Sequence, residues 1–390
     1  MNHPLDTVES PVSSNGIVPW PGTRKHDRLS AQDGRACTMA PLISLFNHKG
    51  GVSKTTTAFN LGWAMADRGK RILIVDGDPQ CNLTGTVLGF DGINDLSNFY
   101  KQHPEANISD CLNPIFQGAG EKLEPATLTG TPNANLFLLA GNIDLAENET
   151  QISVALAASS AIPALQNIPG APCALIRKTA EKHDIDAVII DMSPSVGALN
   201  QCLLMGSDYF IVPTSPDYYC NQAIASLSRV IPRWNNIIAQ FRNENFAYPF
   251  PDDPPKFCGI ISQRYRPRLG NPARSFQQWI DIIKTTVLKE FVPALNVNNM
   301  AISVADFNAA GPGDTPYNLI NIADFNSLIA QSQKHNKPIF ALSDREIEQV
   351  GVILETMKES RDQFKKSFDA LASCVEIIVG ITQRNAAKGV

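Results

Sequence analysis

Residues 46–57 read FNHKGGVSKTTT. A short apolar run, LISL at residues 42–45, precedes them, and residues 58–66 continue in a helical pattern without proline. A strand, a glycine-rich turn and a helix in this order predict a phosphate-binding loop. Paired glycines let the backbone turn tightly and aim its N–H groups at one point, where the helix N-terminus adds partial positive charge. Lys54 would reach the β- and γ-phosphates of a nucleotide, and the Thr55 hydroxyl would hold Mg²⁺.

The loop departs from the common G-x-x-x-x-G-K-[ST] pattern. His48 and Ser53 occupy the two glycine positions, and an extra lysine, Lys49, precedes the glycine pair. This box resembles the deviant Walker A box of the ParA/MinD family of ATPases, in its ParA/Soj-like branch, where the first lysine is called the signature lysine. Many members have glycine at the position of Ser53, so we expect a slightly stiffer or differently shaped loop here. The resemblance implies ATP binding by Lys49, Gly50, Gly51, Val52, Ser53, Lys54, Thr55 and Thr56.

A second motif follows the next buried strand, residues 71–75. It reads DGDPQCNLT at residues 76–84, and carboxylates at the end of a strand beside a phosphate loop lie where open α/β sheets bind ligands. A turn rich in Asp, Gly and Pro is the plain alternative. The motif resembles the family's switch I segment, which implies that Asp78 positions the attacking water and that Asp76 supports the magnesium shell. Lys49, Lys54 and Asp78 are therefore the predicted catalytic residues.

A third motif is the apolar run AVII at residues 187–190, which ends in Asp191. This is a Walker B pattern, whose carboxylate binds Mg²⁺ directly or through water. With Thr55 and Asp76, Asp191 completes the predicted metal site. The family usually continues Asp-x-Pro-Pro, whereas Ser193 replaces the first proline here, which indicates a less rigid backbone.

Later in the chain the signals are weaker. By resemblance, the amide at the end of strand 257–262 faces the adenine, which points to Gln263. The basic residues Arg264, Arg266 and Arg268 follow it, in a locally basic stretch from Lys256 to Glu290. A solvated loop is one interpretation of these charges. Many ParA proteins bind DNA non-specifically through basic residues on this side of the dimer, and such binding needs only phosphate neutralisation.

Composition limits the class of protein. Hydrophobic residues make up 43% of the 390 residues, enough for a real core, and no apolar run is as long as a membrane span. The 8 cysteines are scattered without C-x-x-C pairs, and no signal-peptide h-region is recognisable at the N-terminus. We therefore expect a cytoplasmic protein with reduced thiols and no metal cluster. The net charge is −5, so any DNA binding must come from a local patch.

The domain organisation is predicted as a disordered tail, residues 1–38, followed by one ATPase domain, residues 39–390. The tail carries Pro, Gly and Ser without a helical or strand period. Segments 92–170 and 296–337 are interpreted as insertions. Near the C-terminus, a capping box from Ser343 to Glu346 precedes a helical apolar stripe, which predicts a long helix packed on the core through Ile347, Val350, Ile353, Leu354, Met357, Phe364, Phe368 and Leu371.

Strands alternate with helices, and each motif falls at a strand end. This predicts an α/β fold with a mainly parallel sheet, helices on both faces, and a phosphate-loop NTPase site. The resemblance implies a slow, partner-stimulated ATPase that uses ATP and Mg²⁺, forms an ATP-dependent homodimer, and binds non-specific DNA, so that it is nucleoid-associated when ATP-bound. Its expected partner is ParB-like or another activating protein, and its task is plasmid or chromosome partition or the positioning of another large cargo.

The same superfamily offers three alternative functions. A MinD-like membrane-surface positioning ATPase needs a basic amphipathic tail, which the C-terminus lacks, so a membrane is not an expected partner. A redox member, like the nitrogenase iron protein, needs paired cysteines at a dimer axis. The third alternative is a regulatory switch ATPase in a multi-protein system.

Overall fold

The buried apolar runs of the sequence form one sheet. The computed structural model describes residues 39–89, 93–118, 122–159, 161–268, 271–311, 315–325 and 328–387. Its eight-stranded sheet has the order β10-β7-β6-β1-β5-β2-β4-β3, and all neighbours pair parallel except β3 and β4. The strands are β1 (Leu42–Leu45), β2 (Ile72–Gly77), β3 (Thr129–Gly130), β4 (Leu136–Leu139), β5 (Ala187–Met192), β6 (Tyr209–Thr214), β7 (Lys256–Tyr265) and β10 (Asn318–Ala323). The predicted mainly parallel sheet is confirmed.

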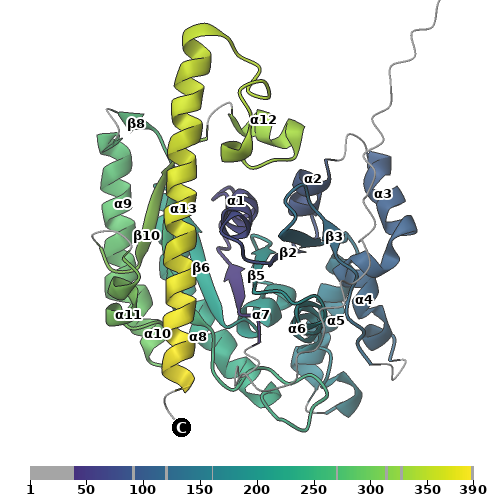
Figure 1. Ribbon diagram of the computed structural model, residues 1–390. Helices are drawn as coiled ribbons and strands as arrows, with labels where there is room; N and C mark the ends of the chain where they lie inside the picture. The colour runs from purple at the N-terminus through teal and green to yellow at the C-terminus, as the bar shows by residue number, and fades with distance from the viewer. Residues whose placement is uncertain are drawn as a thin grey trace, which may run out of the picture. The chain divides into compact units, whose positions relative to one another are not determined.

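Helices follow the strands as the alternation predicts (Figure 1). They are α1 (Lys54–Asp67), α2 (Asn82–Leu88), α3 (Ile93–Gln102), α4 (Ile108–Phe116), α5 (Leu145–Ala158), α6 (Ala171–Lys182), α7 (Ala198–Met205), α8 (Tyr218–Ile238), α9 (Arg274–Thr286), α10 (Val292–Asn296), α11 (Val304–Ala309), α12 (Leu328–His335) and α13 (Gly351–Ala387). A small hairpin, β8 (Pro267–Arg268) with β9 (Asn271–Pro272), connects β7 to α9.

The strand order assigns helices to both faces of the sheet. The chain moves toward the β3 edge from β1 to β2, and toward the β10 edge from β5 to β6 and from β6 to β7. Since parallel crossovers are right-handed, these opposite movements put α1 on one face and α7 and α8 on the other. Helix α13 packs beside α1, and α7 packs between α5 and α8. The central strands β1, β2, β5 and β6 are therefore buried along their whole length.

The C-terminal helix starts later than its sequence pattern predicts. The capping box forms, with Ser343 N donating to Glu346 Oε2 at 2.8 Å, but it closes a turn, and α13 begins only at Gly351. Val350 and Ile353 were predicted to be core residues, and this is wrong, because they are 84% and 58% exposed. Phe364, Phe368 and Leu371 are buried as predicted. Ile347, in the turn before the helix, is also buried as predicted, and within α13 the stripe becomes core where the helix reaches β10 and α1.

The remaining predictions about domain organisation concern the N-terminal tail and the two segments interpreted as insertions. The described residues lie in one compact unit, Ala36–Val390, and the predicted tail, residues 1–38, lies outside the described residues. Segment 92–170 contains β4, which pairs with β2, and segment 296–337 contains β10, which pairs with β7. That these segments are insertions stays a prediction. Within the described part of the chain, no helix is both long and apolar enough to cross a membrane.

Candidate nucleotide-binding site

The site lies at the ends of two neighbouring strands, β1 and β6, whose connections to the next strand run in opposite directions along the sheet. β1 and β6 are neighbours, yet β1 continues toward β2 on one side and β6 continues toward β7 on the other. In open α/β sheets, the crevice at the carboxyl ends of two such strands is where ligands bind. The glycine-rich loop leaves the end of β1 here, and residues 215–217 leave the end of β6.

The loop reaches α1 through two left-handed residues. Gly51 has a φ of 72°, which glycine adopts without strain, and Ser53 has a φ of 62°, which disfavours any residue with a Cβ. The Ser53 carbonyl accepts hydrogen bonds from the backbone N–H of Thr57 at 2.9 Å and from its hydroxyl at 2.8 Å. Ser53 therefore completes the turn in a conformation that favours glycine, at the expense of backbone strain, and a stiffer or differently shaped loop stays a prediction.

Lys54 is folded back on its own loop. Its Nζ donates to the carbonyl of Asn47 at 2.9 Å and to that of Lys49 at 3.4 Å. Burial lowers the pKa of Lys54, while the carboxylates of Asp191 and Asp78 oppose this effect. An ammonium group held inside the turn at the start of α1 is positioned to meet phosphate oxygens.

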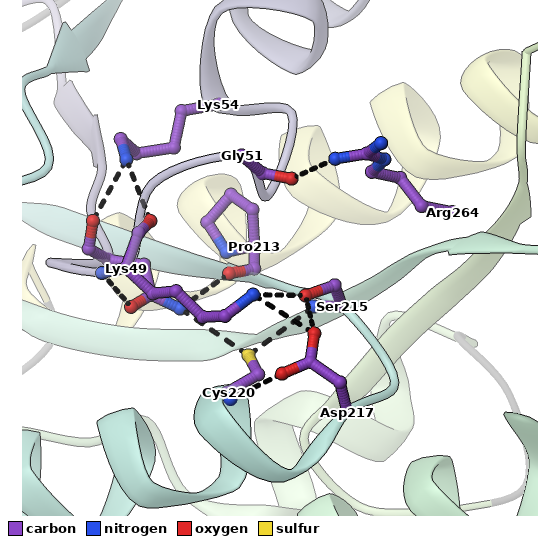
Figure 2. A network of polar contacts seen from close by, with 9 residues as sticks. Lys49, Gly51, Lys54, Pro213, Ser215, Asp217, Cys220 and Arg264 are labelled. Carbon is purple, nitrogen blue, oxygen red and sulfur yellow. Dashed lines mark hydrogen bonds and ion pairs between the residues drawn. The ribbon is translucent and has the colours of Figure 1, made fainter.

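Lys49 points out of the loop toward β6 (Figure 2). Its Nζ lies 3.0 Å from Ser215 Oγ and 3.0 Å from Asp217 Oδ2. Asp217 is also the N-cap of α8, since its Oδ1 accepts from the backbone N–H of Cys220 at 2.9 Å. Burial acts to raise the pKa of Asp217, but hydrogen bonds from Ser215 and Lys49 outweigh it and bring this pKa below its usual range. The two lysines of the loop thus have separate surroundings within the same subunit.

The two carboxylates of the second motif, Asp76 and Asp78, have different surroundings. Asp76 is fully buried, and its Oδ2 accepts from the backbone N–H of Thr84 at 2.8 Å and from its hydroxyl at 2.7 Å. Its Oδ1 accepts from Asp78 N at 3.2 Å. Burial raises the pKa of Asp76 to about 6. Asp76 therefore holds the loop 78–84 in place, and Asp78, also buried, is close enough to Lys54 to act on its charge.

Asp191 is the residue best suited to a cation. It is 1% exposed, and in the described part of the structure neither carboxylate oxygen has a hydrogen-bond partner of normal geometry. Burial and the neighbouring charge of Asp76 raise the pKa of Asp191 to about 8, although the nearby Thr55 hydroxyl and Lys54 act against this. A buried carboxylate without partners is costly unless something positive binds it. Asp191 and Thr55 together therefore fit a hard cation such as Mg²⁺.

The residues predicted to contact adenine and DNA have different surroundings in the structure. Gln263 is fully buried, with Nε2 donating to Thr57 Oγ1 at 2.7 Å and to the Val52 carbonyl at 3.4 Å, so its contact with adenine stays a prediction. Arg264 donates from Nη1 to the Gly51 carbonyl at 2.6 Å. Arg266 is exposed, and for Arg268 the structure describes only the backbone. The Arg264 guanidinium is thus engaged with the glycine-rich loop, and DNA contact by the three arginines stays a prediction.

Three contributors to the site lacked a recognised sequence signal. Asn47 ties the loop to β6, since its Nδ2 donates to the Pro213 carbonyl at 2.9 Å and its Oδ1 accepts from Lys49 N at 2.9 Å. Ser215 and Asp217 bind Lys49 from the far side of the crevice. An Asp just before a helix is an N-cap signal, which could have indicated Asp217 but not its second partner.

The sequence of this chain is similar to those of known proteins. Residues 40–245 match the family described as AAA domain. The sporulation initiation inhibitor protein Soj of Bacillus subtilis is 30% identical over 193 residues, which are 50% of this chain and 65% of that protein. The chain thus spans just under two thirds of the length of this relative. The predicted resemblance to ParA/Soj-like proteins is confirmed.

Solved structures share the fold. The pNOB8 ParA bound to nonspecific DNA aligns with a TM-score of 0.52 at 18% identity, over 88% of this chain and 99% of that one. An ATP complex of a McdA variant from Cyanothece aligns with a TM-score of 0.50 at 16% identity, over 83% of this chain and 96% of that one. At these identities the similarity shows the fold alone.

Proposed function

Because the chain belongs to the AAA domain family and is similar to Soj of Bacillus subtilis, we propose that it is an ATPase that pairs in the ATP state, binds DNA and partitions DNA or positions another large cargo. The observation that carries this proposal is the pairing of two features at one crevice. One is the buried, unpartnered carboxylate of Asp191 beside Thr55 and Lys54. The other is Lys49 at the outer side of the same loop.

ATP and Mg²⁺ are the proposed substrate and cofactor. The backbone N–H groups of Gly50 to Thr56 and the ammonium group of Lys54 would bind the phosphates at the N-terminus of α1. Thr55 and Asp191 would hold Mg²⁺, which neutralises charge on the phosphoryl group when it is bound. The ATP complex of the McdA variant, which has the same fold, supports this assignment.

For hydrolysis, the chain has to orient a water molecule. We assign this role to Asp78. Its own position depends on Asp76, whose Oδ1 accepts from Asp78 N and whose Oδ2 is occupied by Thr84. Both carboxylate oxygens of Asp76 thus already accept hydrogen bonds, and Asp76 would support the metal site indirectly. Asp191 is the carboxylate that we assign as the metal ligand.

Lys49 is assigned to the phosphates of a partner subunit. The Lys54 ammonium group binds the loop of its own subunit, whereas the Lys49 side chain extends away from that loop to Ser215. In a symmetric dimer with two nucleotides facing each other, a lysine at this position would meet charge that develops on the transferred group, as an arginine finger does. A flexible point charge suits that reach. Stimulation by a ParB-like or other partner would act on this assembled state.

DNA is the proposed second ligand. The pNOB8 ParA of the same fold binds nonspecific DNA, and the stretch from Lys256 to Glu290 of this chain is locally basic. Arg266 and Arg268 are the proposed phosphate contacts, with Arg264 beside them in sequence. Binding of this kind would place the ATP form on the nucleoid in the cytoplasm.

The deciding experiment measures molecular mass by size-exclusion chromatography with light scattering, in nucleotide-free, ADP and ATP states, with and without duplex DNA. We expect a dimer with ATP and Mg²⁺ only, and DNA co-elution only in that state. Lys54→Ala should abolish nucleotide binding, because the phosphates lose their main charged partner. Asp78→Ala should still bind ATP and dimerise but lose hydrolysis. A protein that stays monomeric with ATP, or an Asp78→Ala protein with normal turnover, would contradict the proposal.

A further inference from the structure

Arg264 occupies an irregular position at the end of β7. In the pairing with β10, Gln263 lies opposite Ile322 and Tyr265 lies opposite Ala323, so that Arg264 is an extra residue without a partner position. Its φ is 63°, in the left-handed region that favours glycine. This is a β-bulge, and bulges beside functional sites turn a side chain away from its regular direction.

The bulge turns the Arg264 side chain onto the phosphate loop. Its Nη1 donates to the Gly51 carbonyl at 2.6 Å, as Figure 2 shows. The preceding residue, Gln263, donates from Nε2 to the next carbonyl of the loop, that of Val52, at 3.4 Å. Two consecutive residues of β7 thus bind two consecutive carbonyls of the loop. A regular strand would send these two side chains to opposite faces of the sheet, so the double contact depends on the bulge.

Holding these carbonyls also determines where the loop N–H groups point. In a trans peptide, the C=O of one residue and the N–H of the next lie in one plane and point in opposite directions. The bond from Arg264 to the Gly51 carbonyl therefore orients the N–H of Val52, and the bond from Gln263 to the Val52 carbonyl orients the N–H of Ser53. Both N–H groups belong to the segment just before α1, where a phosphate would bind.

We propose that Arg264 is a positioning residue of the phosphate loop, which orients the Val52 N–H toward the phosphates of a bound nucleotide before the nucleotide arrives. The proposal rests on the proposed function, since it takes ATP as the ligand of this loop. It separates Arg264 from Arg266, although both belong to the same basic stretch. Arg264 serves nucleotide binding, and contact with DNA falls to the residues after it.

The first test uses the nucleotide-free protein and compares Arg264→Gly with Arg266→Gly. Each variant loses one positive charge, but only the first loses the bond to Gly51, and glycine suits the left-handed φ of residue 264. Arg264→Gly should keep the melting temperature at or above that of wild type. Hydrogen exchange measured by mass spectrometry should become faster in peptides covering residues 46–57. Arg266→Gly should leave this exchange unchanged. Equal exchange in both variants and wild type would overturn the proposal, whether or not the protein binds ATP.

The second test measures affinity for ATP with Mg²⁺ by calorimetry. Arg264→Gly should bind about tenfold more weakly, since a hydrogen bond to a charged group contributes a factor of this order. Arg264→Lys should recover part of the loss, because the lysine ammonium group can also donate to the Gly51 carbonyl. Arg266→Gly should bind ATP as wild type does. An equal loss in Arg264→Gly and Arg266→Gly would mean a general charge effect and would overturn the positioning role. If wild type itself does not bind ATP, the proposed function fails, while the exchange measurement still decides the contact.

Discussion

The ammonium group of Lys49 lies 3.0 Å from the carboxylate of Asp217, across the crevice between the ends of β1 and β6. Ser215 completes the arrangement, since its Oγ accepts from Lys49 and donates to Asp217 Oδ2 at 2.6 Å. The lysine proposed to act on a partner subunit is therefore held within its own subunit. If Lys49 acts on a partner subunit as proposed, it has to exchange Asp217 for the phosphates of that subunit, and this exchange opposes dimerisation.

Weakening this ion pair should make dimerisation easier. Asp217→Asn removes the negative charge but keeps an oxygen that can cap α8, because Asn is as good an N-cap as Asp. With side chains 24% and 38% exposed, such a pair contributes roughly 0.2–1 kcal/mol. A symmetric dimer exchanges two such pairs, roughly 0.4–2 kcal/mol in total, so we expect ATP-dependent dimers at about two- to thirtyfold lower protein concentration. Light scattering over a dilution series measures this, and Ser228→Ala, on the same helix, is a control. A weaker dimer in Asp217→Asn would mean that Asp217 supports Lys49 in the dimer as well.

The action of Lys49 on the partner subunit can be tested by mixing variants. Lys49→Ala should bind ATP nearly normally, because Lys54 serves its own loop, but it should neither dimerise nor hydrolyse. Lys54→Ala should lack bound ATP but retain Lys49. A mixture of the two should recover part of the hydrolysis that neither has alone, since Lys49 of one subunit meets the ATP of the other. A Lys49→Ala protein with wild-type dimers and turnover would refute the trans mechanism.

Ser53 offers a test of backbone strain. A residue with a Cβ in the left-handed region loses roughly 1–2 kcal/mol, whereas glycine adds about 0.5–1 kcal/mol of chain entropy to the unfolded state. Since Ser53 has a φ of 62° and no side-chain capping bond, Ser53→Gly should stabilise the nucleotide-free protein by about 0.5–1 kcal/mol. Ser53→Ala, which keeps the Cβ, is the matched control and should gain nothing. Urea denaturation compares the three proteins, and equal midpoints would show that the strain is relieved in another way.

Glu346 should make stability depend on acidity. Burial acts to raise its pKa, but hydrogen bonds from Lys337 and Ser343 outweigh burial and lower the pKa of Glu346 to about 2. The folded-state pKa is thus below the usual value, so the ionised group stabilises the fold above about pH 4.5, and this contribution is lost as the pH falls toward about 2. At about pH 7, Glu346→Gln should lower the free energy of unfolding by about 1–2 kcal/mol, because solvent screens part of the interaction that lowers the pKa. The difference from wild type should shrink steadily below about pH 4.5.

The control for this effect is Glu348→Gln. Glu348 pairs with Lys334 on the exposed surface, where solvent screens an ion pair, so its effect should be clearly smaller than that of Glu346→Gln. Urea titrations at several pH values compare the two variants. A Glu346→Gln protein whose stability runs parallel to that of wild type at all pH values would show that the turn does not depend on the ionised carboxylate.

DNA binding should require ATP and weaken with salt, because neutralised phosphates release counterions. The double change Arg266→Glu and Arg268→Glu should reduce DNA affinity and flatten its salt dependence while leaving ATP affinity unchanged. Fluorescence anisotropy with a labelled duplex of arbitrary sequence, at a series of salt concentrations, measures both effects. Unchanged DNA binding by the double variant would place the DNA surface elsewhere. Arg264 is left intact in this test, since its guanidinium contacts the phosphate loop.

The sequence alone determined those parts of the site that are local along the chain. The strand, the glycine-rich turn and the helix that begins at Lys54 are read from neighbouring residues, and so is the position of Asp191 at the end of an apolar run. Hydrophobic periodicity and motif spacing act over a few residues, so they predict single elements well. The same approach placed the start of the last helix too early, because a capping box can also close a turn, as it does at Ser343 and Glu346.

The tertiary structure decided which of these elements meet. The bond from Arg264 to Gly51 joins residues 213 positions apart, and that from Lys49 to Asp217 joins residues 168 positions apart. Both depend on strand order, which puts β6 beside β1, and the first depends also on a bulge in β7. Strand order and register follow from the packing of the whole sheet between its helices. No local pattern encodes such a sum of many contacts, so the partners of Lys49 and Arg264 emerge only when the chain is folded.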